Sequence, residues 1–235
     1  MNGASRLVPL DRFKGALGHR VYQSLQHAIL TLAYRPGEMI RKPEICDHLG
    51  VSRSPLADAV ARLVSDGLVD VVPQAGTFVT RLSMTDIREG CFIREAIEVA
   101  AAELVAPKIT DDQLRELRRN LLMQEALASD TDQQGFIQLD GQMHEMILSF
   151  TGFPRLPHVS QTAWLNVHRA RQLLLPVQGR LQTTLDEHRM ILAAFEARDQ
   201  QAARHAVQQH LRQLLTHLQP LERERPDLFL VQGQP

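Results

Sequence analysis

The sequence is short of the features that mark secreted and membrane proteins. Only two of its 235 residues are cysteines, Cys46 and Cys91, so no disulfide framework can form and a reducing compartment is the simpler interpretation. No stretch approaches the ~18 uninterrupted apolar residues of a membrane-spanning helix. The first residues, MNGASRLVPLDRF, lack the apolar centre of a secretion signal. We therefore expect a soluble, cytoplasmic protein without a membrane partner.

A large excess of charge of one sign is also missing. The formal net charge is −1, with 44% hydrophobic and 23% charged residues, which excludes a disordered chain and a uniformly basic coat for nucleic acid. The balance conceals an asymmetry, because residues 1–82 carry ten Lys+Arg against seven Asp+Glu, whereas the remaining residues carry sixteen against twenty. A mildly basic front and an acidic back indicate two parts with different partners.

The apolar pattern predicts a helical front part that ends in a β-hairpin. Apolar residues recur at helical spacing, and Ser54-Pro55 is typical of an N-cap followed by the first residue of a helix. Two β-rich runs follow, separated by a connection of hairpin length. The expected elements are helices over 17–32, over 43–49 and from Ser54, and strands over 68–72 and 77–80.

Beyond Ser83 the strand signals disappear, and Ser83 and Thr110 stand where N-caps of helices are expected. The expected helices cover roughly 83–106, 110–128, 135–150, 156–175, 178–198 and 199–218, with a polar tail from Pro220. The predicted fold class is mainly α. A winged helix-turn-helix with a small β-hairpin wing (residues 1–82) precedes an all-α bundle of about six helices (residues 83–235).

The front part has the order of elements of a helix-turn-helix with a wing behind it. The N-terminus of the second helix of such a unit enters the major groove of DNA, where basic and hydroxyl side chains meet bases or phosphates. A glycine at the tip of the wing lets the backbone approach DNA closely. Some winged helices instead mediate protein contacts, and Arg53 could be a solvated surface residue. The candidate DNA-binding residues are Arg41, Lys42, Ser52, Arg53, Ser54, Pro55, Gly76 and Thr77.

Residues 17–82 resemble the DNA-binding domain of the GntR family of bacterial transcription regulators. The resemblance is carried by Pro36-Gly37, Gly50 to Pro55 (GVSRSP), Leu63, Gly67-Leu68-Val69, and Gly76 through Val79. It implies a winged helix that binds a double-stranded DNA operator. The sequence departs from the family pattern at Ala57-Asp58-Ala59, where Arg-Glu-Ala is frequent and the arginine contacts the operator, and at Gln74-Ala75, where basic residues are frequent.

The back part holds four residues whose types and positions suit a metal site. Asp140 and His144 are four residues apart, so they share one face of a helix, and a carboxylate and an imidazole there form half of a divalent-metal site. His188 and His210 lie at the edge of apolar faces that must point into a bundle, where helical bundles assemble metal sites. Each histidine could equally be a core or boundary residue with a satisfied hydrogen bond, and the pattern alone leaves both interpretations open.

Residues 86–218 resemble the FCD-type effector domain of the FadR-like branch of GntR regulators, through the stretches FIREAIEVAAAELVA, LDGQMHEMI and GRLQTTLDEHRMILAAFEARDQQAARHAVQQHL. The resemblance implies that a divalent metal is held, with Zn²⁺ favoured and Ni²⁺ or Mn²⁺ as alternatives. The implied ligands are Asp140, His144, His188 and His210. Met143 replaces a frequent phenylalanine and Phe153 a frequent asparagine of the family.

The resemblance also implies a small organic acid as effector, whose carboxylate an arginine would bind. Arg94 stands in the Arg-x-x-x-Glu pattern of the family with Glu98 and is the first candidate for this contact. Arg180 is the second candidate. Alternatively, Arg94 only forms a pair with Glu98 along the helix.

Together these features predict a ligand-responsive, DNA-binding transcription regulator, specifically a repressor released by a small organic acid at the metal site. A homodimer is expected, because such regulators commonly bind two half-sites with two-fold symmetry. The alternative is a metal-dependent enzyme or a protein-interaction adaptor that uses the same Asp/His site. The sequence contains no nucleophile elbow, HExxH motif or glycine-rich phosphate loop, which argues against the enzyme.

Overall fold

The computed structural model describes residues 6–156, 164–174, 176–177 and 179–230. Contacts divide the chain into two compact units. The winged-helix unit contains the residues up to Asp86 and those from Glu222 onwards, and the helical unit contains Ile87–Leu221. The chain passes from the first to the second inside helix α4 (Met84–Val105) and returns inside helix α10 (Gln200–Glu224). No helix among the described residues is long and apolar enough to cross a membrane.

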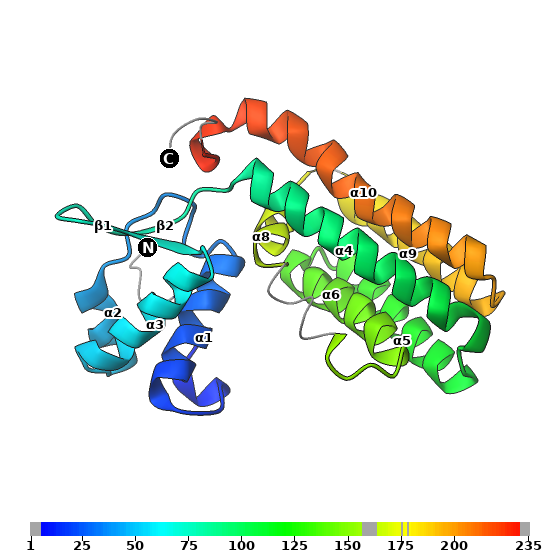
Figure 1. Cartoon of the computed structure of the whole chain (residues 1–235), viewed down its shortest axis with the longest axis horizontal. Coiled ribbons are helices and arrows are strands. Elements are labelled where there is room, and N and C mark those ends of the chain that lie inside the picture. Colours follow the sequence, from blue (N-terminus) through cyan, green and yellow to red (C-terminus); the bar gives the residue numbers. More distant parts are fainter. Residues whose placement is uncertain (1–5, 157–163, 175, 178, 231–235) are drawn as a thin grey trace. The chain divides into compact units, whose positions relative to one another are not determined.

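The winged-helix unit has the predicted order of elements (Figure 1). They are α1 (Leu17–Leu30), α2 (Lys42–Leu49), α3 (Arg53–Ser65), β1 (Val69–Val72) and β2 (Gly76–Val79), after a short 3-10 turn, η2 (Leu10–Arg12). Buried side chains of all three helices form its core, among them Leu25, Ile45 and Leu63. Gly50 ends α2 in the left-handed conformation, with a φ of 63°, which allows the tight turn into α3.

The wing is a two-stranded antiparallel hairpin. Val69 pairs with Val79 and Val72 pairs with Gly76. The segment before α2 extends this sheet, because Ile40 N donates a hydrogen bond of 2.7 Å to Thr77 O. The sheet thereby fixes the backbone just before Arg41 and Lys42, at the start of α2.

The start of α3 differs from its predicted position. Ser52, and not Ser54, is the N-cap, and Pro55 is the third residue of the helix instead of the first. The N–H groups of the first helical turn have no acceptor within the helix, so a proline is tolerated throughout that turn. The serine-proline pattern therefore identified the helix without fixing its first residue.

The C-terminal tail packs within the winged-helix unit, which corrects its predicted place in the helical domain. After the 3-10 turn η4 (Pro226–Leu228), Phe229 forms a parallel bridge with Leu82. Leu82 N donates to Leu228 O, and Leu230 N donates to Leu82 O, each over 2.9 Å. Leu228 and Phe229 are buried, and the burial of their apolar surface holds the tail in place.

The helical unit is an all-α bundle, and its described residues contain no strand. As predicted, Ser83 and Thr110 cap helices: Ser83 Oγ accepts from Asp86 N over 3.1 Å, and Thr110 forms a capping box with Gln113. The helices of the unit are α4, α5 (Asp111–Ser129), α6 (Gln133–Phe150), α8 (Leu165–Leu174), α9 (Arg180–Glu196) and α10, with the 3-10 turn η3 (Ala106–Lys108) after α4 (Figure 1).

Two helices differ from their predicted extents. The helix expected over 156–175 is observed as α8, and residues 157–163 lie outside the described residues. The last helix was expected to end before Pro220, but α10 continues through this proline to Glu224. A proline inside a helix removes one backbone hydrogen bond, yet α10 continues, and Leu218, two residues before the proline, is fully buried.

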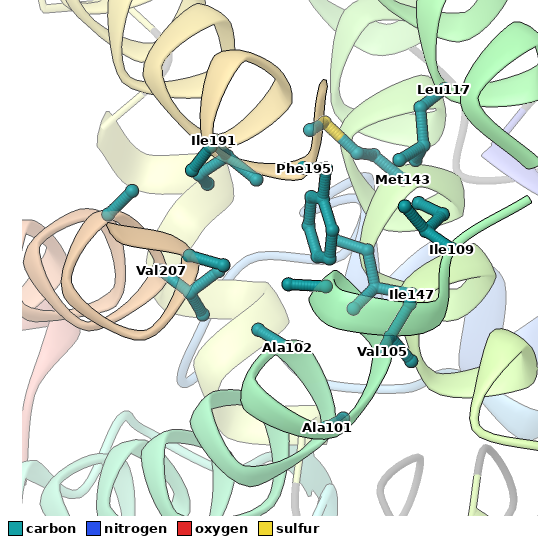
Figure 2. Packing of buried hydrophobic residues seen from close by; sticks show 14 of the residues in the cluster. Ala101, Ala102, Val105, Ile109, Leu117, Met143, Ile147, Ile191, Phe195 and Val207 are labelled. Carbon is teal, nitrogen blue, oxygen red and sulfur yellow. The ribbon is translucent and has the colours of Figure 1, made fainter. Parts of the chain in front are cut away.

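Phe195 lies at the centre of the core of the helical unit. Its side chain is fully buried, and Figure 2 shows side chains of α4, α6 and α10 around it, including Ala102, Met143, Ile147 and Val207. Complete burial of a side chain of this kind contributes ~1.5–3 kcal/mol. This core packs α6, α9 and α10, which carry the predicted metal ligands, against one another.

Candidate metal centre and nucleic-acid interface

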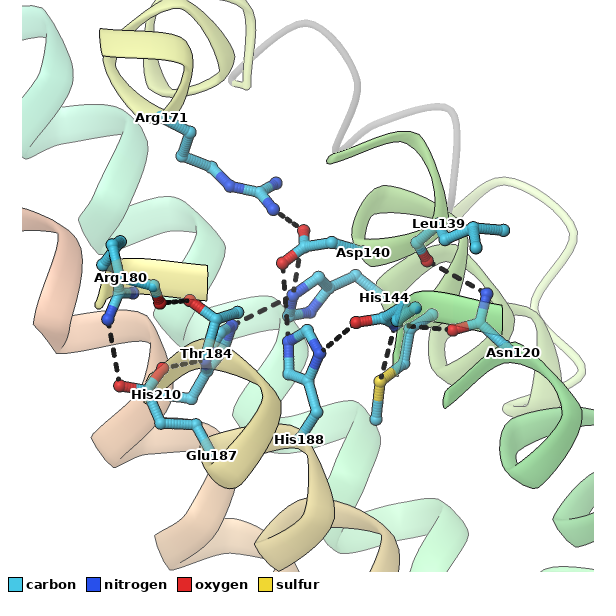
Figure 3. A network of polar contacts seen from close by, with 12 residues as sticks. Asn120, Leu139, Asp140, His144, Arg171, Arg180, Thr184, Glu187, His188 and His210 are labelled. Atoms are coloured by element: carbon cyan, nitrogen blue, oxygen red, sulfur yellow. Dashed lines mark hydrogen bonds and ion pairs between the residues drawn. The ribbon is translucent and has the colours of Figure 1, made fainter. Parts of the chain in front are cut away.

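Three helices bring the four predicted metal ligands together. Helix α6 carries Asp140 and His144 one turn apart, α9 carries His188, and α10 carries His210. One possible ligand atom from each residue lies within 4.8 Å of those of the others, and all four residues are buried. Figure 3 shows the carboxylate and the imidazole rings facing one another. Only Asp140 and His144 are neighbours in the sequence, so the complete cluster depends on the packing of the bundle.

At the centre of this cluster the Nε2 atoms of the three histidines face one another or Asp140. His188 Nε2 is buried without a hydrogen-bond partner among the described residues, and Asp140 Oδ1 lies 3.5 Å from it. His144 Nε2 and His210 Nε2 lie 3.2 Å apart. Three imidazole nitrogens and one carboxylate oxygen are a donor set that Zn²⁺ binds in proteins. The residues present therefore fit a divalent metal.

Burial favours the neutral form of the three imidazoles. It lowers the pKa of His144, although the neighbouring Glu98 opposes this shift. Burial lowers the pKa of His188 and of His210 well below the ordinary value, and the other cationic groups of the cluster add to the effect. A neutral imidazole keeps a lone pair that can bind a metal. The fold thus presents these histidines in the form that a metal requires.

The second ring nitrogen of each histidine, Nδ1, lies beside an oxygen acceptor. These acceptors come from three helices, α4, α5 and α9. The contacts are His144 Nδ1 to Glu98 Oε2 (2.6 Å), His188 Nδ1 to Gln124 Oε1 (2.8 Å) and His210 Nδ1 to Glu187 Oε2 (2.7 Å). The acceptors thus lie on the Nδ1 side of each ring, and the Nε2 atom of each ring lies on the side of the cluster centre.

Three carboxylates in or beside the cluster are each paired with one arginine. The pairs are Arg94 Nε with Glu98 Oε1 (2.5 Å), Arg180 Nη1 with Glu187 Oε1 (3.2 Å), and Arg171 with Asp140. Burial alone would raise the pKa of Glu98, but Arg94 and His144 outweigh it and lower the pKa to about 2. Each pair has no net charge, so the surroundings of the neutral histidines are electrically balanced.

A small cavity opens beside Asp140 and His210. Its volume is about 50 Å³, which is room for a few water molecules or a small ligand. Arginine and apolar side chains line most of it: Arg94, Arg171, Arg180, Phe136, Ile137, Leu174, Leu181, Leu211 and Leu214. Guanidinium groups bind carboxylates with charge-assisted hydrogen bonds, so this lining is suited to a small organic anion.

Both predicted effector arginines, Arg94 and Arg180, line this cavity. Arg94 also forms the pair with Glu98 that the sequence left open as the alternative, and its guanidinium lies over the ring of Trp164, 4.9 Å from the centroid. The two interpretations of Arg94 are therefore compatible. Arg171 joins the two predicted arginines, although the sequence did not single it out.

Sequence reasoning missed Gln124 and Arg171 and gave Glu187 no role of its own. Glutamine and arginine on helices are mostly exposed, and nothing near either residue in the sequence indicates burial. Glu187 directly precedes His188, and neighbouring residues on a helix point in different directions, so the sequence alone does not show which partner Glu187 meets. Its contact is with His210, on another helix. Only the packing of the bundle discloses these contacts.

The predicted DNA-binding residues differ in exposure. Most are exposed, and Pro55 and Gly76 are half-buried. Thr77 is only 4% exposed, so its side chain packs inside the winged-helix unit and is less accessible to DNA than the other candidates. Alternate residues of β2 face the core, and Thr77 is one of them. The exposed members are Arg41, Lys42, Ser52, Arg53 and Ser54.

Known proteins are similar in sequence to this chain over most of its length, across both units. The chain is 28% identical to the HTH-type transcriptional repressor RspR of Escherichia coli K12, over 91% of this chain and 93% of that protein. It is 29% identical to the uncharacterized HTH-type transcriptional regulator YdhC of Bacillus subtilis 168, over 84% of this chain and 88% of that protein. These relatives match both units together.

A solved structure of E. coli McbR/YncC has the same fold. It superposes with a TM-score of 0.77 at 22% identity, over 88% of this chain and 99% of that one. Residues 17–79 match the family described as bacterial regulatory proteins, gntR family, and residues 89–213 match the FCD domain. The chain therefore belongs to the GntR family of bacterial transcription regulators and is a member that carries an FCD domain.

Proposed function

We propose that this regulator is a repressor whose helical unit binds a divalent metal and, at that metal, a small organic acid that releases the protein from its operator. The observation that carries the proposal is the convergence of four buried ligand atoms, from Asp140 and three histidines, within 4.8 Å of one another. Buried imidazoles that face one another without donors between them are costly unless a cation joins them.

The proposed metal is Zn²⁺, held by Asp140, His144, His188 and His210. Zinc combines nitrogen and carboxylate ligands readily and can expand from four to five ligands. Ni²⁺ or Mn²⁺ are the alternatives, because both accept higher coordination numbers. When bound, the metal would supply a Lewis acid that a carboxylate oxygen of the effector can coordinate.

Charge balance supports an anionic effector. In each of the three arginine–carboxylate pairs the two charges cancel, and the histidines are neutral. A divalent cation would therefore give the site an excess of positive charge. A buried excess charge is unfavourable unless a counter-charge accompanies it. The adjacent cavity of about 50 Å³, with its arginines, is where a small carboxylate would lie, and Arg94, Arg171 and Arg180 are its proposed contacts.

The winged-helix unit is proposed to bind a two-fold symmetric DNA operator as part of a homodimer. Arg41, Lys42, Ser52, Arg53 and Ser54 supply exposed groups for phosphates and bases. The name of RspR describes that relative as a transcriptional repressor, which favours repression here. Ligand at the metal would act by shifting the population of arrangements of the dimer. Helix α10 offers a covalent route for this coupling, since it carries His210 and leads into the winged-helix unit.

The test of the metal is a double variant, His144→Ala with His188→Ala, in the full-length chain. We expect the wild type to contain one metal ion per chain by elemental analysis, and the double variant to contain essentially none, because two of four ligands are lost. His205→Ala is the matched control, since His205 is an exposed histidine of α10, and it should retain the metal.

The test of the coupling uses DNA selected by the protein from a random-sequence library, with a thermal-shift screen of small carboxylates to identify a ligand. Bound ligand raises stability by mass action. We expect such a ligand to release wild-type protein from the selected DNA, and not the double variant. If the double variant is released as readily as the wild type, the proposed role of the metal site is wrong.

A further inference from the structure

We infer that Gln124 is a positioning residue that selects which nitrogen of His188 carries the ring proton, so that the Nε2 lone pair is directed at the metal. The inference rests on the proposed metal function, and extends it to a residue that touches neither metal nor effector. Its basis is the hydrogen-bond network on the side of His188 that faces away from the cluster centre (Figure 3).

The amide of Gln124 has only one orientation that satisfies its neighbours. Gln124 Nε2 donates to Asn120 Oδ1 over 2.7 Å, and Asn120 Nδ2 donates in turn to Leu139 O over 3.0 Å. A side-chain oxygen cannot donate to Asn120 Oδ1, so the Gln124 nitrogen must point there. Gln124 Oε1 consequently faces His188 Nδ1 at 2.8 Å. All of these groups are buried, which makes an unsatisfied alternative costly.

A neutral imidazole carries one ring proton, and two acceptors compete for it at His188. Gln124 Oε1 lies 2.8 Å from Nδ1, whereas Asp140 Oδ1 lies 3.5 Å from Nε2. The shorter contact is the stronger hydrogen bond, so Nδ1 carries the proton and Nε2 keeps its lone pair. Without Gln124, the proton would move to Nε2, and Nε2 would donate a hydrogen bond to Asp140. His188 and Asp140 would then bind each other and neither atom would be available to the metal.

His144 and His210 also have an acceptor at Nδ1, but these acceptors are carboxylates that form ion pairs as well. Glu98 also pairs with Arg94, and Glu187 with Arg180. Replacing Glu98 would leave the buried Arg94, and replacing Glu187 the half-buried Arg180, without a counter-charge. Either change would disturb the site in several ways at once. Gln124 is neutral and has no charged partner in the network, so its replacement leaves no charge unpaired; it removes the acceptor at His188 Nδ1 and the donor to Asn120.

The first experiment measures the ring proton directly. Nitrogen-15 NMR of the histidine rings, in full-length protein stripped with a chelator and held at one pH, distinguishes the two tautomers. We expect His188 to be protonated at Nδ1 in the wild type and at Nε2 in Gln124→Leu. Gln124→Glu retains an oxygen acceptor and should keep the proton at Nδ1. Gln134→Leu is the matched control, because Gln134 is a glutamine whose part-buried hydrogen bond goes to Gln172 and not to the cluster, and it should leave His188 unchanged.

The second experiment measures Zn²⁺ affinity of the same proteins by competition with a chelating indicator. Partners that orient a ligating histidine typically contribute about 10–100-fold to metal affinity, so we expect Gln124→Leu to bind Zn²⁺ within that range more weakly and Gln124→Glu to recover most of the loss. A merely structural role would not predict this recovery, since Gln124→Glu also loses the donor to Asn120. Gln124→Met replaces Gln124→Leu if the latter does not fold.

The outcomes separate this inference from the proposed metal function. Wild-type protein that binds no Zn²⁺ refutes the metal function, whatever the tautomers are. Wild-type protein that binds Zn²⁺ but has His188 protonated at Nε2 after stripping overturns the role of Gln124. Equal Zn²⁺ affinity of Gln124→Leu and the wild type overturns it as well.

Discussion

The two units of this chain place their charged side chains in opposite ways. In the winged-helix unit the candidate DNA-contact groups are exposed, and the pair of Arg41 with Glu44 is a long, solvent-exposed contact of 3.7 Å. In the helical unit Arg94 and Glu98 are 5% and 2% exposed, with 2.5 Å between them. Exposed groups remain free to meet a large charged partner, whereas buried groups are fixed before a small ligand arrives.

This difference has energetic consequences. Exposed ion pairs contribute about 0–1 kcal/mol to stability, so the DNA-contact groups of the winged-helix unit can be replaced with little effect on folding. Breaking a buried pair typically costs about 3–5 kcal/mol, because one charge remains buried without its partner. Variants in the helical unit must therefore be checked for folding before a change of function is interpreted.

The largest expected effect is that of Glu98→Leu, which removes the counter-charge of Arg94 and the acceptor at His144 Nδ1. We expect the free energy of unfolding of the helical unit to fall by about 3–5 kcal/mol. Urea unfolding followed by fluorescence of Trp164 measures it, because this single tryptophan of the chain lies in the helical unit.

Glu95→Leu is the matched control for that measurement. Glu95 lies on the same helix and pairs with Arg212, whose side chain is 63% exposed against 25% for Glu95, so the expected loss is below about 1 kcal/mol. Equal losses for the two variants would contradict the distinction drawn between buried and exposed pairs.

Next in size is the effect of Phe229→Ala, which tests whether the tail is part of the winged-helix unit. Phe229 is 3% exposed, and truncation of a buried phenylalanine to alanine costs about 3 kcal/mol or more. We expect lower stability of this unit, followed by fluorescence of Tyr22 and Tyr34, the only tyrosines of the chain. Faster hydrogen exchange at the amides of Leu82 and Leu230 should accompany it.

Leu230→Ala provides the comparison within the tail. Leu230 is 47% exposed, so its truncation removes little buried surface and should change stability by less than about 1 kcal/mol. If both variants leave the amide of Leu82 equally protected, the tail does not stabilise the winged-helix unit.

The two units also differ in how much the sequence could predict. In the winged-helix unit nearly all structure follows from local signals: Gly50 allows the turn, and the alternating residues of β2 form the wing. The exceptions are Thr77, whose inward side of the strand was not recognised, and the tail. The pairing of Phe229 with Leu82 joins residues far apart in the sequence, and no local pattern indicates it.

In the helical unit, local patterns predicted the helices and the half-site of Asp140 and His144. The choice of His188 and His210 depended on resemblance, because a histidine at the edge of an apolar face has several possible roles. The partners Gln124, Arg171 and Glu187 depend on how α5, α8 and α9 pack, and pairwise packing of helices is not encoded in the period of any one helix.

The smallest expected change is in Arg53→Ala, and it addresses function without stability. Arg53 is exposed at the start of α3, so the free energy of unfolding should change by less than about 0.5 kcal/mol. A lost base contact costs about 1–3 kcal/mol of DNA affinity, which is a loss of roughly fivefold to more than a hundredfold. Affinity for library-selected DNA at several salt concentrations measures it. A lower salt slope indicates a phosphate contact, because fewer counterions are then released.

Arg62→Ala is the control, since Arg62 is an exposed arginine in the last turn of the same helix. The major groove receives the N-terminal end of such a helix, so Arg62→Ala should leave DNA affinity within about twofold of the wild type. Zinc content should be unchanged in both variants, because neither arginine belongs to the helical unit. A tenfold loss for Arg62→Ala and none for Arg53→Ala would place the DNA on another face of the winged-helix unit, and the exposed groups at the start of α3 would then need a different partner.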